Sequence, residues 1–114
     1  MKSVVAVSVA VLLLSAPHAV AEVSGTWVKS KSECAIPSGE RDEFEIGGRK
    51  ILNLEFECDV KSRSNKNGYT VDKAVCGGEG SESTEIVRYR VDASGALHIK
   101  IGKQPEEVYR YSCR

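Results

Sequence analysis

The chain has 114 residues and carries 16 basic and 16 acidic side chains, so its formal net charge at pH 7 is zero. Nucleic-acid binding and electrostatic membrane binding both rely on a clustered excess of basic residues, and we expect neither of them here. The length suits one small domain with a limited hydrophobic core.

The first 21 residues have the pattern of a secretory signal peptide. Lys2 precedes an apolar run at 4–14, and Ala19-Val20-Ala21 supplies the small residues of a cleavage site. The run is too short to span a bilayer, which needs about 20 residues, and no cysteine follows it to carry a lipid. We therefore expect cleavage after Ala21 and an exported protein, periplasmic or secreted, with no membrane anchor.

The remaining segment, residues 22–114, predicts a single small all-β domain. Apolar and polar residues alternate along most of it, which is the pattern of half-buried strands; Leu52, Leu54 and Phe56, for example, share one predicted face. No stretch of this segment sustains a helical repeat. The predicted strands are 23–29, 42–47, 51–61, 69–76, 85–92, 96–102 and 107–113.

Glycine-containing turns connect these strands. Lys66-Asn67-Gly68 and Ala93-Ser94-Gly95 each predict a three-residue hairpin loop that ends in glycine. Folding the chain about Ser94 and about Pro105 sets inward-facing residues against one another in three successive strands. The expected pairs are Val87 with Ile101, Tyr89 with Ile99 and Val91 with Leu97 in the first hairpin, and Ile101 with Tyr109, Ile99 with Tyr111 and Leu97 with Cys113 in the second.

The four cysteines all follow the predicted cleavage site, and an even number in a small exported domain indicates disulfides. Folding about Asn67 sets Cys58 opposite Cys76, where the Cβ atoms of facing residues are about 4.5–5.5 Å apart. Cys34 then pairs with Cys113. The competing connectivity, Cys34 with Cys58 and Cys76 with Cys113, remains open at this point. Each bond is expected to contribute roughly 2–4 kcal/mol to stability.

Together these elements predict an antiparallel meander of about seven strands that curls into a closed or nearly closed barrel. Trp27, the only tryptophan, is expected to plug one end of the core. Side chains fill a barrel of this size, which leaves room for a shallow pocket at one mouth. Because Val71 and Cys76 cannot share a face of a regular strand, we expect a β-bulge near Asp72-Lys73.

Two long connections are candidate binding loops, because binding residues often lie on loops held by a rigid scaffold. Residues 30–41 are polar and anchored by Cys34, whereas residues 77–84 are rich in glycine and glutamate. The alternative is that both are ordinary solvated connectors. The candidate partner-binding residues in and beside the second loop are Glu79, Gly80, Glu82 and Glu85.

The composition favours a protein that is not an enzyme and that has no metal or cofactor. His98 is the only histidine beyond the predicted signal peptide and lies on a polar strand face, which is where an ordinary surface histidine lies. The carboxylates alternate along outward faces, whereas a glycosidase needs two that face each other across a cleft. The cysteines are too widely spaced for a zinc or thioredoxin-type motif, and 77–80 lacks the Lys-Ser/Thr of a phosphate loop.

Ser24-Gly25-Thr26-Trp27 resembles the G-x-W start of lipocalin-like barrels. With Cys34, it looks most like the small periplasmic inhibitors of secreted metalloproteases. In that family the residues before the first strand enter the protease cleft, and the corresponding residues here are Glu22, Val23 and Ser24. The second cysteine pair departs from that family. The early Trp and Cys with a terminal Tyr-x-Cys also resemble uncharacterised exported proteins of alphaproteobacteria, a likeness that implies no function.

Two functions from different classes fit these features. The first is a monomeric exported module that protects the cell envelope by inhibiting a hydrolase, either a protease or a lysozyme, through loop 77–84 or the N-terminal arm; an acidic loop suits a basic target. The second is an envelope-associated structural or assembly factor that binds a protein through an exposed sheet edge or face. A small-ligand binder comes third, and an open, apolar barrel mouth would favour it.

Overall fold

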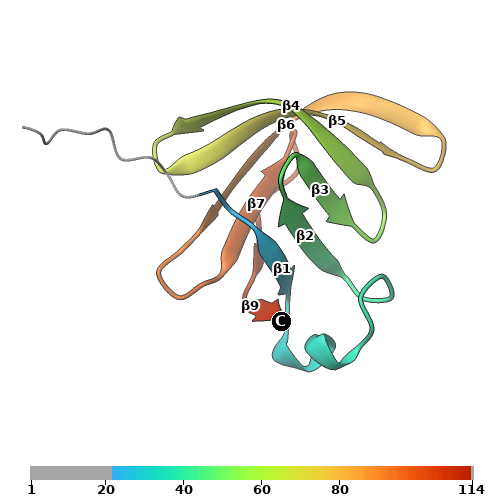
Figure 1. Ribbon diagram of the computed structural model, residues 1–114, viewed down its shortest axis with the longest axis vertical. Helices are drawn as coiled ribbons and strands as arrows, with labels where there is room; N and C mark the ends of the chain where they lie inside the picture. Colours follow the sequence, from blue (N-terminus) through green and yellow to red (C-terminus); the bar gives the residue numbers. More distant parts are fainter. Residues whose placement is uncertain (1–21, 114) are drawn as a thin grey trace, which may run out of the picture.

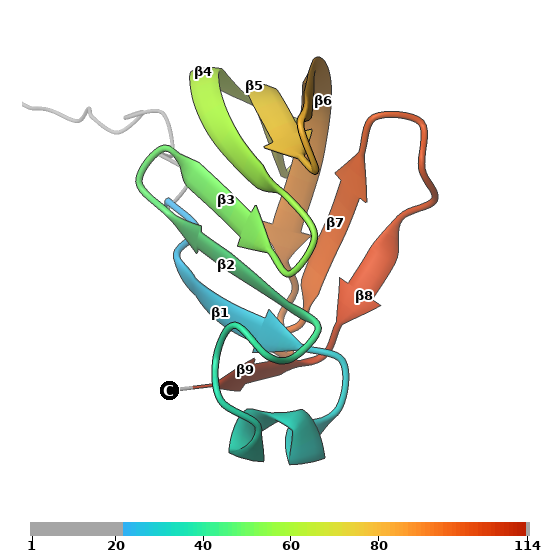
Figure 2. The same ribbon diagram turned by 90° about the vertical axis from the view of Figure 1, so that its right-hand side faces the viewer.

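The computed structural model describes residues 22–113, so the predicted signal peptide at 1–21 lies outside the described residues. The described part is all-β and forms a nearly closed antiparallel barrel with two disulfides, as predicted, although it has nine strands rather than seven (Figure 1 and Figure 2). Among these residues, no helix is both long enough and apolar enough to cross a membrane.

The strands follow one another around the barrel in chain order. They are β1 (Gly25–Val28), β2 (Glu43–Gly47), β3 (Lys50–Asn53), β4 (Glu57–Lys66), β5 (Tyr69–Gly78), β6 (Ser81–Val91), β7 (Leu97–Ile101), β8 (Glu107–Tyr109) and β9 (Tyr111–Cys113), with a short 3-10 helix η2 (Lys31–Ala35) after β1. β8 and β9 are consecutive in the chain yet lie at opposite edges of the sheet. The chain bends at Arg110, so β8 pairs with β7 while β9 pairs with β1.

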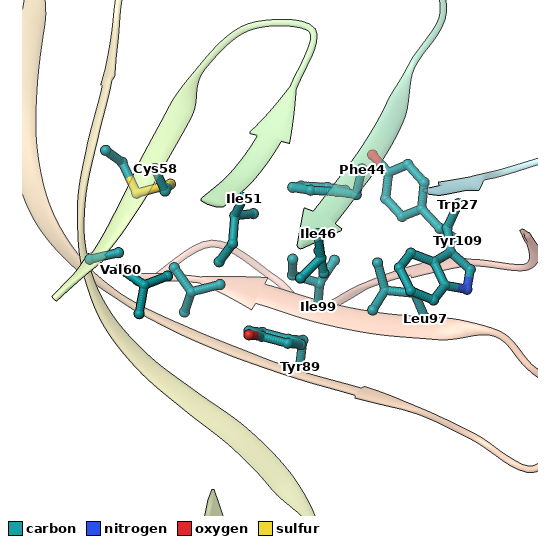
Figure 3. Packing of buried hydrophobic residues seen from close by; sticks show 13 residues of the cluster. Trp27, Phe44, Ile46, Ile51, Cys58, Val60, Tyr89, Leu97, Ile99 and Tyr109 are labelled. Atoms are coloured by element: carbon teal, nitrogen blue, oxygen red, sulfur yellow. A yellow bond between two sulfur atoms is a disulfide. The ribbon is translucent and has the colours of Figure 1, made fainter. Parts of the chain in front are cut away.

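The core is a single cluster of apolar side chains that point into the barrel. Figure 3 shows Trp27 and Tyr109 at one end of this cluster and Cys58 and Val60 at the other. Trp27 is buried, as predicted, and its indole Nε1 donates a hydrogen bond to the carbonyl of Gly95 in the β6–β7 turn at 3.1 Å. This bond satisfies the polar atom of the indole and holds the turn over the end of the core.

The predicted disulfides and the β6–β7 hairpin are confirmed. Cys58 pairs with Cys76 across β4 and β5, and Cys34 joins η2 to Cys113 in β9, which rules out the competing connectivity. The hairpin loop is 93–95, and Gly95 has the expected positive φ of 90°. The three predicted pairs are all present, namely Val87 with Ile101, Tyr89 with Ile99 and Val91 with Leu97.

The β4–β5 hairpin has a different turn and a different bulge from those predicted. Its loop is the two-residue turn Asn67-Gly68, with φ of 54° and 83°, which is the combination that a tight hairpin turn requires. The bulge is at Lys61 in β4 and not near Asp72 in β5. The extra residue offsets the shorter loop, so Cys58 still faces Cys76.

The bulge was predicted in β5 so that Val71 could share the inward face with Cys76. Asp72 is instead completely buried. Arg63 donates to both of its oxygens, at 2.7 and 3.0 Å, and the Tyr89 hydroxyl donates to Oδ2 at 2.6 Å. The bulge makes this network, because the residues of β4 beyond Lys61 exchange faces and Arg63 turns inward.

The predicted β7–β8 register is wrong. The chain was expected to fold about Pro105, but it turns earlier, from Gly102, where φ is 56°. Leu97 therefore faces Tyr109. A shift of four residues keeps the parity of the strand, so Tyr109 still points inward. Tyr111 does not pair with Ile99; it lies in β9 beside Val28 and is 40% exposed.

The predicted strand 51–61 is two strands, and the predicted loop 77–84 is mostly strand. The chain turns between Asn53 and Glu57, so Leu54, expected to face the core, is 54% exposed. β5 and β6 continue to a two-residue turn at Glu79-Gly80, where φ is 52° and 87°. The predicted loop 77–84 is therefore the paired tip of a long hairpin. Val91, also predicted to face the core, is 38% exposed.

Candidate functional site

A groove lies at the mouth of the barrel. Two adjoining hollows of about 620 and 580 Å³ form it, and they share Glu55, Phe56, Ile101 and Gln104. One wall is the β3–β4 turn and the other is the β7–β8 loop; Figure 2 shows the first turn to the left of β7 and the loop to its right. We call this surface the mouth groove.

The floor of the mouth groove is aromatic and aliphatic. The rings of Phe44 and Tyr109 pack edge to face with centroids 4.9 Å apart, and Phe56 lies 5.9 Å from Phe44. Ile99 and Ile101 complete the floor. Covering such a surface with an apolar group is favourable by roughly 25 cal/mol per Å² of apolar surface removed from water.

The rim of the mouth groove is acidic. Five carboxylates and two ammonium groups line it, and these are Asp42, Glu55, Glu79, Glu85 and Glu107 with Lys29 and Lys103. Lys29 is already engaged, since its Nζ lies 3.7 Å from Asp42 and 3.4 Å from Glu107. The groove therefore presents a net negative potential above an apolar floor.

Tyr109 connects the rim to the floor. Its hydroxyl donates to Asp42 at 3.0 Å or to Glu107 at 3.1 Å, and Lys29 lies 5.2 Å above its ring. Burial, and then the neighbouring Asp42 carboxylate, raises the pKa of Tyr109 well above its ordinary value. The phenol thus stays protonated and holds the Asp42 carboxylate in place.

Gly78 allows the β3–β4 turn to close one side of the groove. A Cβ at this position would collide with the backbone carbonyl of Glu55. The turn itself is fixed by Asn53, whose backbone N–H donates to the carbonyl of Phe56 at 2.9 Å and whose side chain accepts from the N–H of Glu55 at 3.1 Å. The groove wall is therefore set by local hydrogen bonds.

The predicted acidic residues of 77–85 divide between two faces. Glu79 and Glu85 line the mouth groove, where the Ser83 hydroxyl donates to Glu85 at 2.6 Å. Glu82 lies on the opposite face of the hairpin with Glu57, because residues an odd number apart on a strand point to opposite faces. Gly80 forms the turn. The four residues do not make one surface.

The predicted N-terminal arm lies far from this hairpin tip. Val23 packs against the core, and Glu22 accepts a hydrogen bond from Arg63 of β4 at 3.0 Å. Ser24 is exposed between Val23 and β1. Figure 1 shows the β4–β5 and β5–β6 turns at opposite ends of the long hairpins, with the start of β1 nearer the first. A single small contact cannot include both the arm and Glu79.

Residues 30–41 are not a loosely solvated loop. The buried Arg41 donates through Nη1 to three carbonyls of this segment, at 2.8–3.3 Å, and through Nε to Glu43 at 2.6 Å. Ser38 donates to the other oxygen of Glu43 at 2.6 Å. Sequence analysis did not identify this pair, since Arg and Glu are ordinarily surface residues.

We expect the Glu43 pair to make stability fall in acid. Burial raises the pKa of Glu43, but the hydrogen bonds from Ser38, Arg41 and the Gly39 N–H lower it by more, to below the ordinary 4.5. A carboxyl with a depressed folded pKa stabilises the fold above its unfolded pKa and loses that contribution as pH falls. Urea unfolding at pH 6 and at about pH 3.5 should show a smaller acid-induced loss in Glu43→Gln than in wild type.

The exposed Glu40→Gln is the matched control and should follow wild type in the same two titrations. An acid-induced loss in Glu43→Gln equal to that of wild type would contradict the assignment.

His98 lies on the outward face of β7, where the sequence predicted it. Its Nε2 is 2.7 Å from Asp92 and its Nδ1 is 3.4 Å from Glu106. Hydrogen bonds from Ser94 and then from His98 hold the pKa of Asp92 well below its usual range. His98 does not line the mouth groove.

No protein-family model matches the chain, and no curated protein or solved structure is significantly similar to it.

Proposed function

We propose that the protein is an exported, non-enzymatic binding module that inhibits a hydrolase, a protease or a lysozyme, in the periplasm and so protects the cell envelope. The mouth groove, an apolar floor inside an acidic rim, is the observation that carries this proposal. The two disulfides indicate an oxidising compartment outside the cytoplasm.

The chemistry of the groove suits a basic target. The carboxylates of Glu55, Glu79 and Glu85 steer and orient a positively charged surface. The exposed Leu54 on the β3–β4 turn offers an apolar anchor beside them. A target that inserts a Lys or Arg side chain would cover the apolar floor with its methylene groups and leave its charge at the rim.

The rigidity of the scaffold also favours inhibition. The β5–β6 hairpin is paired to its two-residue turn, and a disulfide crosses the neighbouring β4–β5 pair. A preordered surface loses little conformational entropy on binding. An assembly factor would instead be expected to show a contiguous apolar patch, whereas the exposed apolar residues are distributed over several elements, at Ile36, Leu54, Ile86, Val91 and Tyr111.

Inhibition assays with the purified, oxidised protein test the proposal, with a lysozyme and a serralysin-type metalloprotease as targets. Replacing Glu55, Glu79 and Glu85 together by Ala should raise the inhibition constant about 10-fold or more, because three rim charges are lost. The matched control replaces Glu57 and Glu82, which lie on the outer face, and should inhibit like wild type. An equal rise of the inhibition constant in both variants would mean that the target contacts another surface. If wild type inhibits neither hydrolase, both named targets are rejected.

A small-ligand binder is the second candidate, and the volume and aromatic floor of the groove favour it. Measuring hydrolase inhibition and probe binding on the same protein distinguishes the two functions. Absence of hydrolase inhibition, together with binding of an apolar fluorescent probe that Leu54→Asp weakens, would favour the ligand function.

A further inference from the structure

The outward face of the long hairpins is basic toward the β4–β5 turn, whereas Glu57, Asp59 and Glu82 lie on this face toward the β5–β6 turn. Val87 and Tyr89 of β6 are buried, so the residues that alternate with them point out of the barrel. Strand pairing sets Arg88 beside Lys100, and Arg90 beside His98. We define the basic face by its five cations, which are Lys66, Lys73, Arg88, Arg90 and Lys100.

These cations are not neutralised by carboxylates. Within residues 22–113, none of the five forms an ion pair. The neighbouring carboxylates include Glu106, which accepts a hydrogen bond from Tyr69 at 3.2 Å and lies 3.4 Å from His98, and Asp92, which lies 2.7 Å from His98. The charges of the basic face therefore remain available to a partner.

The two arginines are held in position. The guanidinium carbons of Arg88 and Arg90 lie 4.7 and 5.4 Å from the centre of the Tyr69 ring. Cation–π contacts of this kind restrict the long side chains and leave the edges of the guanidinium groups free for hydrogen bonding. The forked donors of arginine match the oxygens of a phosphate.

We propose that the basic face binds the surface of an anionic phospholipid bilayer. Its cations spread over four strands, roughly 15 Å across at the usual strand spacing, and none of them lines the mouth groove. An array of several cations on one face fits a surface of mobile phosphate headgroups. Tyr69, with its polar tip, and Ile86, which is 47% exposed, suit the headgroup level.

The zero net charge of the chain does not oppose this binding, because the acidic groups lie at the mouth groove and near the β5–β6 turn, whereas the cations of the basic face lie nearer the β4–β5 turn. Separate surfaces of opposite sign act on a partner individually when they lie farther apart than the screening length, about 8 Å at physiological salt. The inference is independent of the proposed inhibition.

Co-sedimentation of the purified protein with vesicles tests the inference. Vesicles of phosphatidylcholine mixed equally with phosphatidylglycerol should bind the protein, whereas pure phosphatidylcholine vesicles should not. Raising NaCl from about 0.05 to about 0.3 M should weaken the binding. Lys73→Glu with Arg88→Glu should lower the partition coefficient at least about 30-fold, because each cation near an anionic surface contributes a factor of ~5.

The control, Lys31→Glu with Arg110→Glu, changes the net charge equally at two exposed positions that belong neither to the basic face nor to the mouth groove, and it should bind like wild type. Circular dichroism spectra of all three proteins establish that each is folded. Failure of wild type to bind the anionic vesicles, or an equal loss of binding in the control, would overturn the inference. Equal binding to neutral vesicles would overturn it as well.

Discussion

Arg63→Met is expected to lower the free energy of unfolding by about 3–5 kcal/mol, because it leaves a buried carboxylate without its countercharge. The side chain of Asp72 has no exposed surface, and Arg63 supplies two of its three side-chain hydrogen bonds. Tyr89, which supplies the third, carries no charge in the range of physiological pH, since burial and its bond to Asp72 raise its pKa well above the ordinary value.

Urea unfolding at neutral pH measures this fall in the free energy of unfolding. Two further variants show whether the lost charge causes it. Arg63→Met combined with Asp72→Leu removes both charges and should recover much of the stability, since an apolar pair of similar volume often replaces a buried ion pair at little cost. Lys50→Met breaks a pair with Glu57 and Asp59 on the surface and should leave unfolding unchanged within error. A loss in the double variant as large as in Arg63→Met would show that packing, not charge, is responsible.

The fold class and the covalent framework were predictable because they depend on local signals that repeat. Alternation of apolar and polar residues predicts which side chains point inward. This prediction was correct for four residues of β6 and β7, which are Val87, Tyr89, Leu97 and Ile99. The glycine at Gly95 located one hairpin loop, and that register gave three correct pairs. The pairing of Cys58 with Cys76 was also predicted, although the turn and the bulge that produce it both differ from the prediction.

The features that the sequence did not show depend on tertiary pairing. The turn after Asn53 contains neither glycine nor proline, so the alternation runs through it and conceals the break between β3 and β4. The bend at Arg110 arises because the two halves of the last predicted strand pair with different edges of the sheet. Aspartate side chains are usually exposed, and Asp72 is buried because Arg63, nine residues away in the sequence, pairs with it.

The candidate site was predictable only where its residues are neighbours in the sequence. Glu79 and Glu85 belong to one acidic, glycine-rich segment and were identified by composition. Asp42, Glu55 and Glu107 come from three separate parts of the chain, and the barrel alone brings them to one rim. The separation of Glu82 from its neighbours required knowing that 81–91 is a strand and not a loop.

Removing the Cys34–Cys113 disulfide is expected to destabilise the protein more than removing Cys58–Cys76. The first bond joins residues 79 apart in the sequence and the second joins residues 18 apart. The chain-entropy relation gives losses of about 4.5 and about 3 kcal/mol. The first loss approaches the whole stability of a small domain, which is about 5–15 kcal/mol.

The architecture adds to this difference. β9 has three residues and pairs with β1 alone, so Cys113 and this short ladder together close the barrel between its first and last strands. Cys58 and Cys76 instead lie within a β4–β5 ladder that is already paired along its length. Loss of the first bond should therefore release β9 and expose the buried Val28 beside it, whereas loss of the second should leave the barrel closed.

Urea unfolding of the two oxidised double variants checks the order, with Cys34→Ala/Cys113→Ala expected to unfold at the lower urea concentration. Cys58→Val with Cys76→Ala keeps the volume of the core roughly constant, so that a cavity does not add to the loss. Hydrogen exchange provides the second readout, because the β1 amides that pair with β9 should exchange faster in the first variant alone. Faster exchange there in the Cys58/Cys76 variant, or the reverse order of unfolding, would mean that the β4–β5 disulfide, and not the terminal one, keeps this barrel closed.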